Sequence, residues 1–146
     1  MTRILSKINR DRMLAVSIGI VYLWFGALKF FPNLSPADGL AKQTIELLTL
    51  GLIPQNVSIL LLAILEVGIG LGLVFQFKLR IVVSIALAHL CLTFIPVLFF
   101  PSLSFAKAPF VLTLVGQYIV KNIIIICALM YIYPLGNSAK FIVKQN

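Results

Sequence analysis

Apolar residues along the chain fall into four long runs, separated by short segments that are richer in polar residues, proline and glycine. Each run has about the length that a helix needs to cross the hydrocarbon core of a bilayer, roughly 20 residues. The pattern therefore predicts membrane-spanning helices over residues 13–31, 57–75, 81–100 and 114–133. Because no repeat or polar linker divides them, we expect one domain over residues 1–146, an all-α integral membrane protein folded as a four-transmembrane-helix bundle.

The connection between the first two runs, SPADGLAKQTIELLTLG, has a helical pattern of its own. Ser35 is a typical N-cap residue, and Gly51 is a typical residue after a helix end. Charged residues recur every four positions, at 38, 42 and 46, and apolar residues fill much of the rest. We expect a short amphipathic interfacial helix over about residues 36–50 and a second interfacial segment in FPSLSFAKAPF.

Charge follows the same division of the chain. The protein has 12 Lys and Arg residues against 4 Asp and Glu, a net charge of +8. Ten of the basic residues lie in the segments before, between and after the predicted spans. Eight are in the N-terminal segment, the 76–80 turn and the C-terminal tail, whereas Lys42 and Lys107 are in the other two loops. The asymmetry predicts that both termini are cytoplasmic. It also accounts for the basic charge through topology and anionic lipid, so no nucleic-acid partner is expected.

Four ionisable side chains lie inside the predicted spans: Lys29, Glu66, His89 and Lys121. A charge near the middle of a bilayer costs at least about 2.5 to 3.5 kcal/mol, so such residues persist where they are paired or used. Counting along the helices puts Glu66 and Lys121 at matching depth, which predicts a pair between them. The same count puts Lys29 roughly 25 Å from Arg12 and so in the outer third of its span, where its stem could snorkel outward or bend toward the same cluster.

Helical phase adds polar neighbours to these four residues. The expected ligand-binding set, in the outer half of the bundle, comprises Tyr22, Lys29, Glu66, His89, Gln117, Lys121 and Asn122. In one interpretation the Glu66 and Lys121 pair only joins two helices. In another, the two ammonium groups exceed the single carboxylate and favour a ligand with a carbonyl or anionic head group. A proton or ion path is a third interpretation.

Other site chemistries have less support. His89 is the single histidine of the chain, so no metal site is expected from histidines alone. Cys91 and Cys127 fall in different spans without a Cys-x-x-Cys spacing, so we expect free thiols. No residue is identified as catalytic.

Three stretches, LWFGALKFFPNLSP, LLAILEVGIGLGL and GQYIVKN, resemble the corresponding stretches of the DoxX-like family of small bacterial four-span membrane proteins, which includes a branch related to reactive chlorine resistance. The resemblance runs over about residues 13–134. The positions that carry it are Gly26, Lys29, Glu66, Gly70, Gly116, Gln117, Lys121 and Asn122.

The resemblance implies a place in membrane redox systems. The member that names the family is a small subunit of a thiosulfate:quinone oxidoreductase, and other members are linked to oxidative or thiol stress. We accordingly expect a multi-pass protein of the bacterial inner membrane, at most a membrane subunit of an oxidoreductase complex. A bound quinone or lipid-like molecule would be its ligand, with no cofactor of its own, and a soluble redox enzyme its electron-supplying partner. A non-catalytic scaffold and a small permeation unit are the alternatives, the latter as a homo-oligomer.

Overall fold

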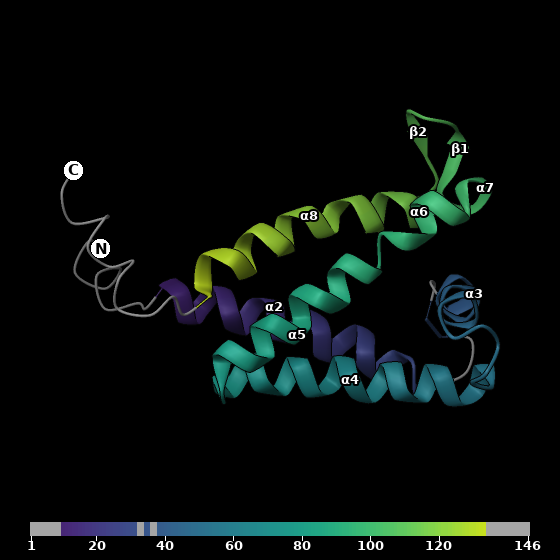
Figure 1. Ribbon diagram of the computed structural model, residues 1–146. Coiled ribbons are helices and arrows are strands. Elements are labelled where there is room, and N and C mark those ends of the chain that lie inside the picture. The colour runs from purple at the N-terminus through teal and green to yellow at the C-terminus, as the bar shows by residue number, and fades with distance from the viewer. Residues whose placement is uncertain (1–9, 32–33, 36–37, 134–146) are drawn as a thin grey trace.

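The computed structural model of the protein describes residues 10–31, 34–35 and 38–133 (Figure 1). Within this part, four helical segments are long and apolar enough to cross a membrane, which confirms the expected helical architecture. Their helices are α2 (Arg10–Leu28), α4 (Gln55–Phe75), α5 (Leu79–Leu92) with α6 (Ile95–Phe99), and α8 (Leu114–Ile132). Each segment begins and ends within three residues of its predicted bounds.

The remaining elements gather at one end of the bundle (Figure 1). They are α3 (Asp38–Leu48), α7 (Pro101–Ser104), β1 (Phe105–Lys107) and β2 (Val111–Leu112). The amphipathic helix predicted over 36–50 is confirmed as α3, with residues 36–37 outside the described part. Gly51 ends it as predicted: its φ is +74°, and its N–H bonds to the Glu46 carbonyl oxygen at 2.9 Å.

The second connection differs from the prediction, because it contains a β-hairpin. β1 and β2 pair antiparallel between α7 and α8. Thr113 closes the hairpin: its N–H bonds to the Ser104 carbonyl oxygen at 3.0 Å, and its hydroxyl donates to the Leu103 carbonyl oxygen at 2.7 Å. The same hydroxyl accepts from the N–H of Gly116 at 3.1 Å and caps α8. An all-α prediction misses the hairpin because three- and two-residue strands are too short to show a period.

The third apolar segment is also not a single helix. α5 ends at Leu92, and the helix resumes as α6 at Ile95. Pro96 accounts for the break, because it has no N–H for the Leu92 carbonyl and its ring would collide with that group. Thr93 occupies the break, with its hydroxyl donating to the Leu90 carbonyl oxygen at 2.6 Å.

α2 and α4 form the most extensive helix contact of the bundle. Their backbones meet at Gly19 and Gly70, where a Cβ added to Gly70 would lie 2.9 Å from the Gly19 carbonyl oxygen and 2.7 Å from Leu23 Cγ. One step along the contact, a Cβ on Gly26 would lie 2.9 Å from the Cβ of Glu66. Glycines therefore bring the two helices close enough for side chains on them to pair.

Much of the outside of the bundle is apolar. Trp24 is 67% exposed, Ile124 71% and Leu98 77%. Water-soluble monomers rarely expose apolar patches on this scale, so this surface suits lipid or another protein. The inside holds a small core around Ala15, Leu73, Val83, Ala86 and Leu129, all with no exposed surface.

Candidate functional site

An ion pair between Lys29 and Glu66 lies at the centre of the polar side chains. Lys29 Nζ and Glu66 Oε2 are 2.6 Å apart, with side chains only 8% and 10% exposed. Lys29 follows the last residue of α2, and Glu66 is in the middle of α4. Gly26, one turn before Lys29, lets α2 approach the backbone of Glu66. The ammonium also lies 3.5 Å from the Phe25 carbonyl oxygen.

His89 of α5 contacts the other oxygen of the same carboxylate. Its Nε2 lies 3.5 Å from Glu66 Oε1, and its side chain is 12% exposed. That distance exceeds the usual 2.7–3.2 Å of a formed hydrogen bond, so the contact is loose. Glu66 thus joins α2 to α5 through its two oxygens.

Tyr22 completes the group from α2. Its hydroxyl oxygen lies 3.2 Å from His89 Nδ1 and 3.4 Å from the Ala86 carbonyl oxygen. The side chains of Tyr22, Lys29, Glu66 and His89, which we call the polar cluster, therefore form a continuous chain of contacts across three helices.

The polar cluster has two consistent proton arrangements, since the histidine tautomer follows from its partners. In the first, Tyr22 donates to Nδ1 of His89, and the Nε2–H faces an ionised Glu66. In the second, Tyr22 donates to the Ala86 carbonyl oxygen and accepts from Nδ1–H, and Glu66 carries a proton facing the bare Nε2. The second arrangement holds one proton more. A proton added at Nδ1 can therefore appear on Glu66.

Lys121 and Gln117 lie apart from the polar cluster. Both are exposed on α8, and the Lys121 ammonium lies 5.7 Å from the centre of the Tyr118 ring. The predicted Glu66 and Lys121 pair is therefore wrong: Glu66 pairs with Lys29. Depth and spacing do not determine which way α8 is rotated, and the contact of α8 with α2 and α5 turns this face outward.

Asn122, the next residue on α8 and a member of the expected ligand-binding set, bonds to a residue outside the polar cluster. Its side-chain amide donates to the hydroxyl oxygen of Thr93 at 3.1 Å. It thus joins α8 to the break between α5 and α6. The sequence signal for this break is Pro96, because a proline interrupts the helix before it and leaves Thr93 at a helix end.

The side chain of Lys29 bends toward Glu66, which is one of the two orientations expected for it. Glu66 is the twelfth of the 21 residues of α4, so the ammonium of Lys29 lies level with the middle of that helix. α2 is shifted along α4, with Gly19 beside Gly70. Figure 1 shows the start of α2 extending beyond the end of α4.

Charge in the polar cluster balances in the first arrangement, with one ammonium and one carboxylate. The surplus of positive charge that favoured an anionic ligand depends on Lys121 and does not exist in the cluster. What remains is a neutral, mostly buried group with one loose contact between Glu66 and His89. Such a group can offer a hydrogen bond and exchange a proton.

Comparisons with protein-family models, with curated proteins and with solved structures give no match. The resemblance to the DoxX-like family stays a prediction that rests on the three quoted stretches.

Proposed function

We propose that this chain is a multi-pass protein of the bacterial inner membrane with both termini in the cytoplasm. Four long apolar segments and an apolar outer surface support the membrane setting. The distribution of Lys and Arg supports the orientation, because it places α3 and the hairpin on the side that carries few basic residues.

In that setting, the polar cluster binds the carbonyl head group of a quinone, and the chain is the membrane component of a quinone-linked redox or oxidative-stress-defence system. The observation that carries this proposal is the loose 3.5 Å contact between Glu66 and His89 beside the ammonium of Lys29. An ammonium has three N–H groups: Glu66 Oε2 accepts one at 2.6 Å, and the Phe25 carbonyl oxygen, at 3.5 Å, is only a loose contact for a second. The third is available to a carbonyl oxygen.

The cluster also suits the protonation of a quinone. Reduction to the quinol adds two electrons and two protons to the ring oxygens. In the protonated arrangement, Glu66 supplies the first proton next to the bound carbonyl. A proton that then enters through His89 protonates Glu66 again and supplies the second. The electrons come from a redox enzyme partner.

Binding of a short-chain benzoquinone to purified protein in detergent tests this proposal. Replacing both charged members, Lys29→Met with Glu66→Gln, removes the donor without leaving an unpaired charge. We expect binding to weaken at least about tenfold, the usual effect of losing a hydrogen bond to a charged group. Lys121→Met is the matched control and should bind like wild type. Equal binding by the double variant, or no saturable binding by wild type, would reject the proposal.

A scaffold that anchors partner proteins is the second candidate. It is favoured by one observation: every buried side-chain nitrogen and oxygen in the described residues has a hydrogen-bond partner. A group satisfied in this way can serve as a joint between helices without any ligand. In that case the Lys29→Met, Glu66→Gln double variant keeps its abundance, its partners and its phenotype together, whereas a ligand site loses the phenotype alone.

A further inference from the structure

Gln117, Tyr118 and Lys121 form a second polar group on the outward face of α8, which we call the α8 surface group. Gln117 and Lys121 are four residues apart, on one side of the helix, and Tyr118 is 53% exposed. Apolar side chains continue this face toward the C-terminal end of α8, with Ile124 71% and Tyr131 73% exposed. The face is therefore amphipathic along the helix axis, with polar groups in its first half.

Among the described residues, Lys121 pairs with no acidic side chain. All four acidic side chains lie in the described residues, and three have contacts elsewhere: Glu66 with Lys29, Asp38 with Lys42 at 2.7 Å, and Glu46 with Gln55 at 2.9 Å. The fourth, Asp11, is in the first turn of α2, at the other end of the bundle from the start of α8 (Figure 1).

The ammonium is directed toward the start of α8. Side chains of a helix point back toward its N-terminus, and the Lys121 ammonium lies by the ring of Tyr118, one turn nearer that end. Tyr118 is five residues from the N-cap Thr113, or roughly 7 Å along the axis. In a bilayer with a hydrocarbon core of about 30 Å, a lysine at this level reaches the phosphate layer.

We propose that the α8 surface group binds the phosphate of an anionic phospholipid. Lys121 neutralises the phosphate, the Gln117 amide donates to its oxygens, and the acyl chains follow Ile124 and the apolar residues beyond it. The inference rests on the membrane setting proposed above but not on the quinone site. It assigns Gln117 and Lys121 to a lipid outside the bundle.

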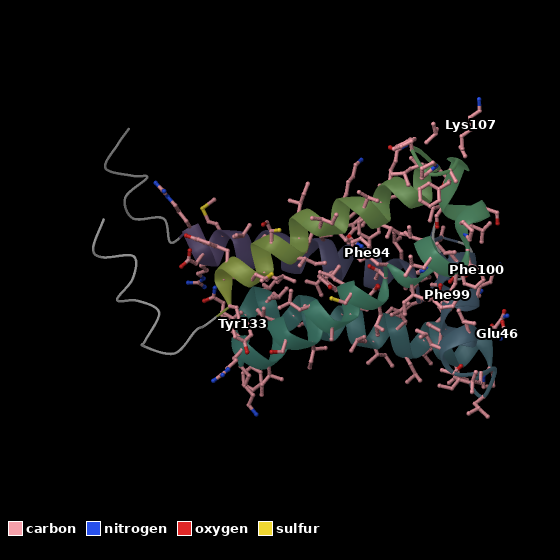
Figure 2. All side chains as sticks on the ribbon, turned by 45° about the horizontal axis from the view of Figure 1, so that its top comes forward. Glu46, Phe94, Phe99, Phe100, Lys107 and Tyr133 are labelled. Atoms are coloured by element: carbon pink, nitrogen blue, oxygen red, sulfur yellow. The ribbon has the colours of Figure 1, made fainter. Side chains whose placement is uncertain are left out.

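Native mass spectrometry of the purified full chain tests this site, with dioleoyl phosphatidylglycerol and dioleoyl phosphatidylcholine as probes. Wild type should retain phosphatidylglycerol in preference to phosphatidylcholine. Lys121→Gln should weaken that retention about fivefold, the effect of one basic residue at a membrane surface. Lys121→Arg should restore it. Lys107→Gln is the control: it removes the same charge from the hairpin, where Lys107 projects away from the helices (Figure 2).

Three results would overturn the inference: equal retention of both lipids by wild type, unchanged retention in Lys121→Gln, or an equal loss in Lys107→Gln. A transmembrane protein that copurifies with wild type and is lost from Lys121→Gln would overturn it in favour of a protein partner. Quinone binding is measured on the same variants. If Lys121→Gln loses the lipid but still binds quinone, the α8 surface group is a lipid site separate from the quinone site. If the chain binds lipid but no quinone, only the proposed function is rejected.

Discussion

Glu66 is the residue on which the contacts between three helices converge. Its Oε2 pairs with Lys29 beyond α2, and its Oε1 faces His89 of α5. A buried carboxylate is costly without such partners, because burial removes the water that stabilises its charge. Removing either partner therefore affects more than one helix contact.

Replacing Lys29 should destabilise the protein, whereas replacing Lys121, the other lysine within the predicted spans, should have little effect on stability. Lys29→Met leaves Glu66 without its ion pair, and we expect the free energy of unfolding in detergent to fall by about 3 to 5 kcal/mol. Lys121→Met should change it by less than about 0.5 kcal/mol, since the residue is exposed. Chemical denaturation followed by Trp24 fluorescence measures both. Adding Glu66→Gln to Lys29→Met should recover much of the loss, and equal effects of the two lysines would contradict this account.

At this scale the sequence predicts which residues are unusual, but not how they pair. Lys29, Glu66 and His89 stand out because charge is rare in apolar runs. Their pairing depends on the rotation and shift of each helix, which weakly amphipathic, almost wholly apolar helices do not encode in their polar pattern. Lys121 is assigned to the wrong group for that reason.

Among the elements, the pair of α2 and α4 is defined by glycines rather than by large side chains. Gly19, Gly26 and Gly70 face the contact, whereas a Cβ on Gly68 would meet nothing within 4 Å. This part of the fold was predictable, because the glycines on α2 share the face of Tyr22 and Lys29, and Gly70 shares the face of Glu66. The shift of one helix along the other was not predictable, since several pairings of small residues fit the same face.

Alanine substitutions at two glycines of α4 separate the effect of close helix contact on stability from the effect of helix propensity. Gly70→Ala places a methyl group against the backbone of α2 and should cost about 1 to 3 kcal/mol of stability. Gly68→Ala, two residues away and open, should be neutral or stabilise by up to about 1 kcal/mol, because alanine favours the helix. Thermal unfolding of both variants in detergent provides the comparison. A Gly70→Ala protein as stable as Gly68→Ala would mean that α2 and α4 do not approach as closely as described.

For the whole molecule, the two ends of the bundle differ in charge and in structure. Figure 2 shows Glu46, Phe99, Phe100 and Lys107 at one end and Tyr133 at the other. Near Tyr133, the Arg80 Nε donates to the Tyr133 hydroxyl at 3.3 Å and joins α5 to α8. Hydropathy predicts the four segments of this layout, because each is long and apolar enough to cross a membrane.

Labelling of single cysteines tests the orientation. In a chain with Cys91→Ala and Cys127→Ala, we introduce either Lys107→Cys in the hairpin or Lys78→Cys in the turn before α5. A membrane-impermeant maleimide added to intact spheroplasts should label the first and not the second, because the proposed orientation puts the strongly basic turn on the cytoplasmic side. The reverse pattern would invert the proposed topology, and labelling of both would argue against a membrane-spanning bundle.

In the proposed membrane setting, the ion pair between Lys29 and Glu66 would also affect how this part of the bundle responds to voltage. A single charge moved through a membrane potential changes in energy by about 2.3 kcal/mol per 100 mV. A paired ammonium and carboxylate 2.6 Å apart are neutral together, so the electric field across the membrane exerts almost no net force on them. Protonation of Glu66 leaves the ammonium uncompensated. In the proposed setting, the proton that would serve a quinone would therefore also make the polar cluster sensitive to the membrane potential.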